Sequence, residues 1–338
     1  MRRLKILLLL AVCMLLTSCQ GVRREEPKNS IRIGISLYRG EDTFINNLRS
    51  IMEEKAKEYE RENGIKVILD IQDAKGSQNI QNNQVERFIS LDCDVLCINL
   101  VDRMDASVII DRAMTAGVPV VFFNRQPVEE DINRWDQLYY VGVDAKETAI
   151  LQGKMVVDLY KEKPEVVDLN GDGVVSYVML EGETSHQDSL IRTEWSVQTL
   201  KDGGVPIEKI TGGIANWERS QASALMEQWI AEYPDTIELV ISNNDDMALG
   251  AIDAMERAEV TEVNVIGIDG TTPGLEALES GKLLGTVSAN KELYASAIVE
   301  LAASCALGQG PPEEYPLTDG AYYWTPQEIL IHKIEEIP

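Results

Sequence analysis

The chain is short of positive charge. Its 338 residues include 31 Lys and Arg against 56 Asp and Glu, which gives a formal net charge of −25 at pH 7. Nucleic-acid phosphates need a basic protein face, so this balance argues against a DNA- or RNA-binding protein. A basic cluster and a glycine-rich phosphate loop are both missing, which argues against a nucleotide or phosphate site.

Long hydrophobic runs are also lacking. The apolar run from Ile6 to Leu16 is too short for a bilayer core, which needs about 20 residues, and no later segment is apolar enough to span one. Arg2, Arg3 and Lys5 precede this run and small residues follow it. A basic start, a short apolar run and small residues at the end are typical of an export signal.

The segment that ends this run, "LTSC" (16–19), resembles the lipobox of bacterial lipoproteins. The resemblance implies a signal peptide over residues 1–18, cleavage before Cys19 and acylation of its sulfur. Residues 19–30 would then form a polar linker between the lipid anchor and a body outside the cytoplasm.

Cysteine is scarce after the N-terminal segment. Residues 20–338 contain only Cys93, Cys97 and Cys305. Cys93 and Cys97 lie in "CDVLCINL", an expected strand, so four steps along it hold them ~13 Å apart. That distance is beyond the reach of a disulfide, and a spacer of three residues is unusual for zinc. We expect all three to be small apolar core residues.

Short β-rich runs alternate with helical periodicity along the remaining chain, which predicts parallel sheets with helical crossovers. The expected strands are residues 31–37, 65–71, 94–100, 118–123, about 174–180, 237–242, 263–268 and 283–288. The remaining length of about 320 residues suits two domains better than one core. We therefore predict an α/β chain with two doubly wound parallel-sheet domains.

Both domains are expected to be discontinuous, because "LTDGAYYWTPQEILIHKI" holds strand-like residues after the last long helix and can recross between them. The expected N-terminal lobe comprises residues 31–122 and 290–318. The expected C-terminal lobe comprises residues 123–289 and 319–338.

Polar and aromatic side chains collect after the expected strands. Ligands bind beyond the carboxyl ends of the strands in doubly wound sheets, so these side chains would meet at one rim. The set consists of Asp42, Phe44, Asn99, His186, Asp188, Arg192, Asn244 and Asp269, with Trp217 in the connection "GGIANWERS".

Each member of this set has a simpler explanation. Asp or Asn after a strand commonly caps the next helix, Trp217 alone suits a core, and His186 suits a loop or a cap. Their convergence favours a binding site. Planar acid, amide and guanidinium groups make paired hydrogen bonds, and aromatic rings offer flat apolar faces. A pyranose sugar needs both kinds of group.

Five segments of the chain resemble the periplasmic galactose/glucose-binding proteins, which supply sugar ABC transporters. They are "INLVD" (98–102), "VPVVFFN" (118–124), "YYVG" (139–142), "HQDSLIR" (186–192) and "ISNNDDMALGA" (241–251), within a collinear match from about Ile31 to Leu307. The resemblance implies a type I periplasmic binding protein fold, with two lobes on a hinge.

The resemblance also assigns roles to the polar set. Phe44 and Trp217 would sandwich the sugar, and Asp42, Asn99, His186, Asp188, Arg192, Asn244 and Asp269 would hydrogen-bond it. The chain departs from the family at "GTVSAN" (285–290), where Ala289 stands in place of an Asn and Asn290 follows one position later. Either the loop shifts to bring Asn290 to the sugar, or one contact is lost.

The stretch "VVDLNGDGVVSYVMLEG" (166–182) has the spacing of a calcium loop, with Asp168, Asn170 and Asp172 in alternation and Gly173 at the sixth position. Met179 stands where a closing Glu is expected. The pattern alone fits a decayed loop, a chance turn, or a site whose last ligand comes from elsewhere.

The family resemblance favours the third interpretation, because these proteins close such a loop with a Glu from a distant strand. Here that residue is Glu238 in "TIELVIS". The resemblance implies a structural Ca²⁺ held by Asp168, Asn170 and Asp172, the carbonyl of Val174, the ninth-position oxygen of Ser176, and Glu238.

The function expected from the resemblance is capture of galactose or glucose, without catalysis, by a monomer that delivers the sugar to an ABC permease. A chemoreceptor is a further partner that it allows. One alternative is a binding protein for another monosaccharide. Another is a glycoside hydrolase using Asp42, Asp188 and Asp269. We expect Arg192 to keep those acids ionised, which would leave no proton donor.

Two more functions fit the sequence poorly. Sugar-sensing repressors of related fold carry an N-terminal DNA-binding module and basic charge, whereas this chain begins with an export signal. A calcium-dependent cohesion module would repeat its loop, and the sequence contains one such loop.

Overall fold

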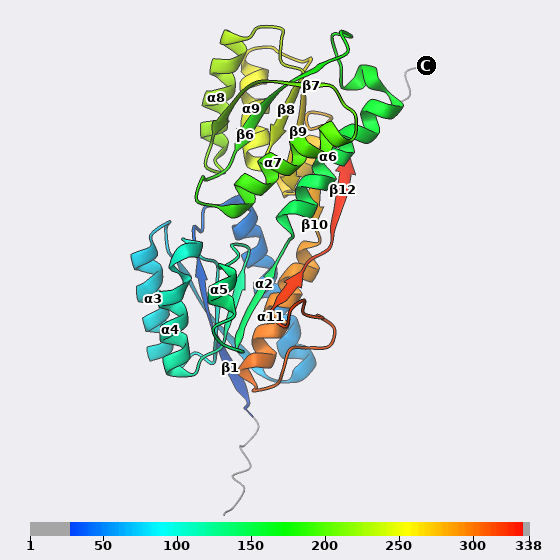
Figure 1. Cartoon of the computed structure of the whole chain (residues 1–338). Helices are drawn as coiled ribbons and strands as arrows, with labels where there is room; N and C mark the ends of the chain where they lie inside the picture. Colours follow the sequence, from blue (N-terminus) through cyan, green and yellow to red (C-terminus); the bar gives the residue numbers. More distant parts are fainter. Residues whose placement is uncertain (1–27, 334–338) are drawn as a thin grey trace, which may run out of the picture.

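A computed structural model describes residues 28–333 as two α/β lobes stacked end to end (Figure 1). The expected signal peptide over residues 1–18, the acylated Cys19 and most of the expected linker lie outside the described residues. Within residues 28–333, no helix has the length and apolar character needed to cross a membrane.

The N-terminal lobe is built on a parallel six-stranded sheet with the order β11-β5-β4-β3-β1-β2. Its strands are β1 (Ser30–Leu37), β2 (Lys66–Asp73), β3 (Val95–Ile98), β4 (Val120–Phe123), β5 (Leu138–Gly142) and β11 (Tyr322–Trp324). Its helices are α2 (Thr43–Asn63), α3 (Gln78–Ser90), η1 (Arg103–Asp105), α4 (Ala106–Ala116), α5 (Glu129–Ile132) and α11 (Lys291–Ala306).

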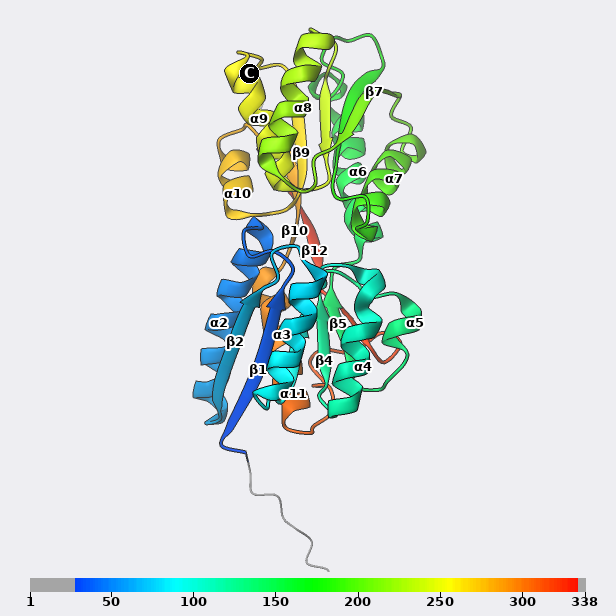
Figure 2. The same cartoon turned by 90° about the vertical axis from the view of Figure 1, so that its left-hand side faces the viewer.

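Helices cover both faces of this sheet, and the alternation along β3 shows why. Cys97 packs with α2 and α11, whereas Leu96 and Ile98 pack with α3 and α4. Successive strand residues point to opposite faces, so a strand buried on both sides must be apolar throughout. Figure 2 shows α3 and α4 in front of the lower sheet and α11 behind it.

The C-terminal lobe contains a second six-stranded sheet, of order β12-β10-β9-β8-β6-β7, in which β12 alone runs antiparallel to its neighbour. Its strands are β6 (Val175–Glu181), β7 (Ile207–Ile214), β8 (Leu239–Ser242), β9 (Asn264–Asp269), β10 (Gly285–Ala289) and β12 (Gln327–Ile331). Its helices are α6 (Ala145–Glu162), η2 (Pro164–Val166), α7 (Gln187–Asp202), α8 (Arg219–Glu232), α9 (Asp245–Arg257) and α10 (Thr272–Glu279).

The two doubly wound lobes confirm the predicted fold class, but the predicted division of the chain was wrong in two places. Residues 123–142 belong to the N-terminal lobe, because β5 pairs with β4 through Val120 opposite Leu138. Residues 319–324 also belong there, because β11 pairs with β5. Neither β5 nor β7 was among the strands predicted from the sequence.

The chain crosses between the lobes at three places, and these crossings are tied to one another. They are the β5–α6, β10–α11 and β11–β12 connections. Thr325 N donates to Gly142 O at 2.7 Å, and Asn290 N donates to Pro326 O at 3.3 Å. Three short, adjacent crossings make a hinge about which the lobes can turn.

All three described cysteines are free and buried, as predicted. Burial raises the pKa of the Cys93 thiol to about 11 and that of Cys305 to about 12, so both stay protonated at neutral pH.

Candidate functional site

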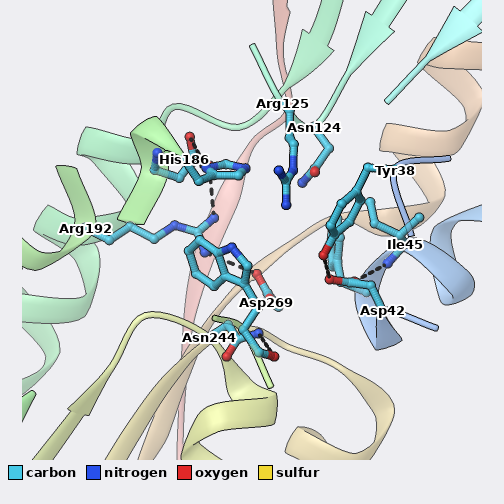
Figure 3. A pocket seen from close by; sticks show the side chains of 12 residues that line it. Tyr38, Asp42, Ile45, Asn124, Arg125, His186, Arg192, Asn244 and Asp269 are labelled. Atoms are coloured by element: carbon cyan, nitrogen blue, oxygen red, sulfur yellow. Dashed lines mark hydrogen bonds and ion pairs between the residues drawn. The ribbon is translucent and has the colours of Figure 1, made fainter. Parts of the chain in front are cut away.

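A cavity lies between the lobes, where the carboxyl ends of strands from both sheets face one another. It contains about 360 Å³ of empty space, its mouth included. The N-terminal lobe lines it with Tyr38, Asp42, Phe44, Ile45, Asn124 and Arg125, and the C-terminal lobe with His186, Asp188, Arg192, Trp217, Asn244 and Asp269 (Figure 3).

The structure brings eight of the ten predicted site residues together in this cavity. They are Asp42, Phe44, His186, Asp188, Arg192, Trp217, Asn244 and Asp269. Their simpler explanation also holds for three of them, since Asp42 caps α2, His186 caps α7 and Asn244 caps α9. Capping fixes each of these side chains at the rim and leaves further polar capacity for a ligand.

Asn99 does not line the cavity, which corrects the expectation of a direct contact. Its side chain is fully buried, accepts from Tyr38 N at 3.2 Å, and donates to Phe123 O at 3.3 Å and Asn124 Oδ1 at 3.1 Å. These bonds hold the segments that follow β1 and β4. Asn99 therefore stabilises the backbone next to the cavity and does not line it.

Asn290 is also placed outside the cavity. Its side chain is exposed and caps α11 by accepting from Leu293 N at 3.0 Å. The loop after β10 has therefore not shifted to replace the missing family Asn.

Arg192 is the charged centre of the C-terminal side. Its Nη2 lies 3.5 Å from Asp188, and its Nη1 lies 3.6 Å from Asp269 and donates to Asn243 O at 2.9 Å. Its buried Nε has no partner among the described residues. A buried donor without a partner destabilises the folded protein unless a ligand oxygen accepts its hydrogen bond.

Burial outweighs this ion pair in setting the protonation of the two acids. It raises the pKa of Asp188, and it raises the pKa of Asp269 well above its usual value, although Arg192 acts in the opposite direction on both. Contrary to our expectation, Arg192 therefore does not bring the pKa of either acid below its usual value. The ion pair alone gives no reason to exclude an acid catalyst.

His186 is neutral in this site. Burial, with the charges of Arg125 and Arg192 nearby, lowers its pKa well below the usual value. Its Nδ1 accepts from Asp188 N at 3.1 Å, so the proton resides on Nε2, which can donate to a ligand oxygen.

Two aromatic rings reach the cavity from opposite lobes. Phe44 lies in the first turn of α2, and Trp217 follows β7; each is 9% exposed. The Trp217 ring lies 5.3 Å from His186, edge to face, and its buried Nε1 has no partner among the described residues. Each lobe thus contributes one aromatic ring to the wall of the cavity.

Left-handed backbone recurs at the cavity. Asn124, Trp217 and Asp269 have φ angles of +62°, +67° and +113°. Such conformations are costly for residues other than glycine and persist where the surrounding structure holds them, commonly at binding sites.

Four lining residues were not predicted from the sequence: Tyr38, Ile45, Asn124 and Arg125. Asn124 and Arg125 directly follow β4, so the rule applied to the other strands would have found them. Arg125 is almost buried. Its guanidinium lies 3.8 Å from the centre of the Tyr38 ring, donates to Val101 O at 2.9 Å, and pairs with Glu183 of the other lobe at 2.9 Å.

The loop with calcium-like spacing lies between η2 and β6, and Glu238 reaches it from the start of β8. Glu238 accepts from Leu169 N, Asn170 N and Ser176 N at 2.7, 3.0 and 2.8 Å. Within residues 28–333, no three His, Cys, Asp or Glu side chains are gathered closely enough to hold a metal ion. The structure thus joins the distant Glu to the loop through backbone hydrogen bonds.

Comparison with known proteins gives this arrangement a family. The profile of the periplasmic binding protein domain matches residues 33–310. The D-galactose/methyl-galactoside binding periplasmic protein MglB of Haemophilus influenzae is 34% identical over 283 residues, which cover 83% of each chain. The ribose import binding protein RbsB of Bacillus subtilis is 27% identical over 295 residues, 85% of this chain and 88% of that protein.

A solved structure agrees with these relatives. The crystal structure of an ABC transporter solute binding protein from Bacillus halodurans, with bound myo-inositol, superposes with a TM-score of 0.75 at 28% identity, over 91% of this chain and 96% of that chain. The chain belongs to the periplasmic binding protein family, and it is a non-enzymatic, extracytoplasmic substrate-binding protein of the ABC transporter type.

Proposed function

We propose that this protein captures one monosaccharide between its lobes and delivers it to an ABC permease. The observation that carries the proposal is the cavity that Phe44 and Trp217, from opposite lobes, line together with a set of planar polar groups. Ring faces suit the C–H surfaces of a sugar, and acids, amides and guanidinium groups suit its hydroxyls.

The charge of the cavity favours a neutral ligand. Each arginine of the cavity already has an acidic partner, because Arg125 pairs with Glu183 and Arg192 lies beside Asp188 and Asp269. A sugar phosphate or uronate would therefore meet no unpaired cation. The unpartnered Nε of Arg192 and Nε1 of Trp217 are donors that sugar oxygens would complete.

Galactose or glucose is the ligand that we propose. The galactoside-binding relative from Haemophilus influenzae supports this choice, and the cavity holds the predicted ligand residues except Asn99 and Asn290. Because Ala289 offers no amide, the sugar would lose one hydrogen bond relative to the family pattern. Another monosaccharide or a cyclic polyol is the second candidate, favoured by the inositol-bound neighbour.

Entry of the sugar requires the lobes to separate. The lining side chains of His186, Asp188, Arg192 and Trp217 are all less than 10% exposed, so this wall of the cavity is largely shielded from solvent as it stands. Rotation about the three crossings would open it, and closure over the sugar would present both lobes to a permease or a chemoreceptor in one geometry.

We propose a structural Ca²⁺ in the loop after η2. Asp168, Asn170, Asp172 and Ser176, the carbonyl of Val174, and Glu238 are all oxygen ligands, the kind that Ca²⁺ prefers. A carboxylate oxygen that accepts one backbone hydrogen bond keeps a second lone pair. The ion would offset the repulsion among three acids and stabilise this end of the lobe.

We further propose that the protein is a monomer tethered by an acyl chain on Cys19. The support is the sequence pattern at residues 16–19. If Cys19 is acylated, globomycin, an inhibitor of lipoprotein signal peptidase, should cause a precursor that retains residues 1–18 to accumulate.

Isothermal titration with a panel of hexoses, pentoses and inositols tests the central proposal. We expect one sugar per chain, with galactose or glucose among the tightest. Absence of binding to every member of the panel would contradict the proposed function. Sustained release of nitrophenol from a chromogenic galactoside or glucoside would contradict the non-catalytic role.

A further inference from the structure

Glu183 lies in the segment after β6 and reaches across the cleft to the N-terminal lobe. Its carboxylate is 2.9 Å from Arg125 Nη2 and 3.8 Å from Arg39 Nη2. Arg39 also pairs with Glu218 of the C-terminal lobe at 2.8 Å. Three ion pairs therefore join the lobes at the edge of the cavity, and Glu183 takes part in two of them.

The contact of Glu183 with Arg125 continues into the binding site. The Arg125 guanidinium lies 3.8 Å from the centre of the Tyr38 ring, and the Tyr38 hydroxyl donates to Asp42 Oδ2. The other oxygen of Asp42 accepts from Ile45 N at 2.9 Å. A continuous series of contacts thus links an acid of one lobe to a cavity carboxylate of the other (Figure 3 shows its N-terminal part).

Opening of the lobes breaks this series at one place. Arg125 keeps its bond to Val101 O, and Tyr38 keeps Asp42, because all of these lie within the N-terminal lobe. The Glu183 carboxylate leaves with the C-terminal lobe. A guanidinium that loses its carboxylate partner is free to leave the ring face, since the ion pair that helped to fix its plane has gone.

We propose that Glu183 is a positioning residue for the sugar site: on closure it fixes Arg125 over Tyr38, and through the Tyr38 hydroxyl it orients Asp42 toward the ligand. The role rests on the proposed function of sugar capture. It makes the geometry of the N-terminal half of the site depend on closure, so that a sugar is held firmly only when both lobes meet.

The consequence is kinetic. In the open form, where the sugar first docks, Glu183 contacts neither arginine, so it has no effect on association. In the closed form its loss weakens both the bridge between the lobes and the orientation of Asp42. Removing a partner of a largely desolvated charge pair acts mainly on the dissociation rate.

The test uses Glu183→Gln with stopped-flow tryptophan fluorescence and D-galactose, or the tightest-binding sugar of the panel. We expect dissociation about tenfold faster, with association within about twofold and an unchanged melting temperature without sugar. Glu227→Gln is the matched control, because Glu227 pairs with Arg257 inside the C-terminal lobe. It should leave both rates unchanged.

Tyr38→Phe separates positioning from simple bridging. If Glu183 acts through the Tyr38 hydroxyl, the double variant should dissociate about as fast as the faster single variant. Effects that multiply, or unchanged dissociation in Glu183→Gln, would overturn the inference and leave sugar binding intact. A native protein that binds no sugar would contradict the proposed function itself, and this inference with it.

Discussion

The indole ring of Trp217 lies directly against Gly182. A Cβ placed on Gly182 would stand 2.2 Å from Cζ2 of that ring and 2.3 Å from Cε2 and Cη2. Real atoms do not approach so closely, so only glycine leaves room for the ring in its observed position. Gly182 therefore sets the depth at which the ring enters the cavity.

Gly182→Ala should consequently displace Trp217 and weaken sugar binding by roughly tenfold or more, the loss of about 1.4 kcal/mol or more. Titration calorimetry measures the affinity, and the fluorescence of Trp217 reports its environment. Gly310→Ala is the control, because no atom lies within 4 Å of its added carbon. Native affinity in Gly182→Ala would mean that the ring position does not matter.

Trp217→Ala tests the ring itself. Removing one of the two flat faces should weaken binding strongly, because stacking contributes roughly 0.5–1.5 kcal/mol beyond the burial of apolar area. Trp195→Ala provides a matched loss of indole, since Trp195 stacks with Lys146 away from the cavity. Equal affinities of the two variants would show that Trp217 is a core residue only.

Asp245 makes stability depend on pH in an unusual direction. This fully buried acid accepts from Thr271 N at 2.7 Å and from the Thr286 hydroxyl at 2.7 Å, with Lys291 and Asp269 nearby. Burial nevertheless raises its pKa to about 6. The folded state then binds more protons than the unfolded state between about pH 4 and pH 6, so this contribution to stability falls as pH rises through that window.

Asp245→Asn should remove the dependence. Urea denaturation measures the free energy of unfolding of the variant and of the native protein at each pH. The variant's value minus the native value should rise by up to about 3 kcal/mol between pH 4 and pH 7. For Asp253→Asn the same difference should fall as pH rises, because Arg219 lowers the pKa of Asp253. A constant difference between Asp245→Asn and the native protein would rule out this role.

Most of the fold followed from the sequence where burial imposes a pattern. The alternation of Ile31, Ile33, Ile35 and Leu37, and the apolar run Val95–Ile98, are typical of strands. The strand β7 was missed because its residues are mostly half-buried or exposed at a sheet edge, where "IEKITGGI" has no apolar pattern. The strand β5 was missed because "LYYVG" is short. It is also followed closely by a helix that was assigned to the other lobe.

The site followed from the rule that ligands meet strand ends, and its errors concern side-chain direction. Nothing in "INL" shows that the Asn99 amide turns inward to hold Tyr38 and Asn124 instead of facing a ligand. Arg125 directly follows β4 and could have been found by the same rule, but its pairing with Glu183, 58 positions later in the chain, could not. Pairings across a hinge have no local signature in sequence.

The proposed calcium loop gives the last prediction, in which calcium and Glu238 act on the same end of the C-terminal lobe. Glu238 accepts three backbone hydrogen bonds of the loop, so Glu238→Gln should lower the melting temperature somewhat even in chelator. Calcium should raise the melting temperature of the native protein but add little to that of the variant, because the amide carries no charge for the ion. Glu262→Gln, an exposed change of equal charge in the same lobe, should keep the full calcium effect. If differential scanning calorimetry shows equal melting points for the native protein in calcium and in chelator, the loop is a hydrogen-bonded turn without a metal.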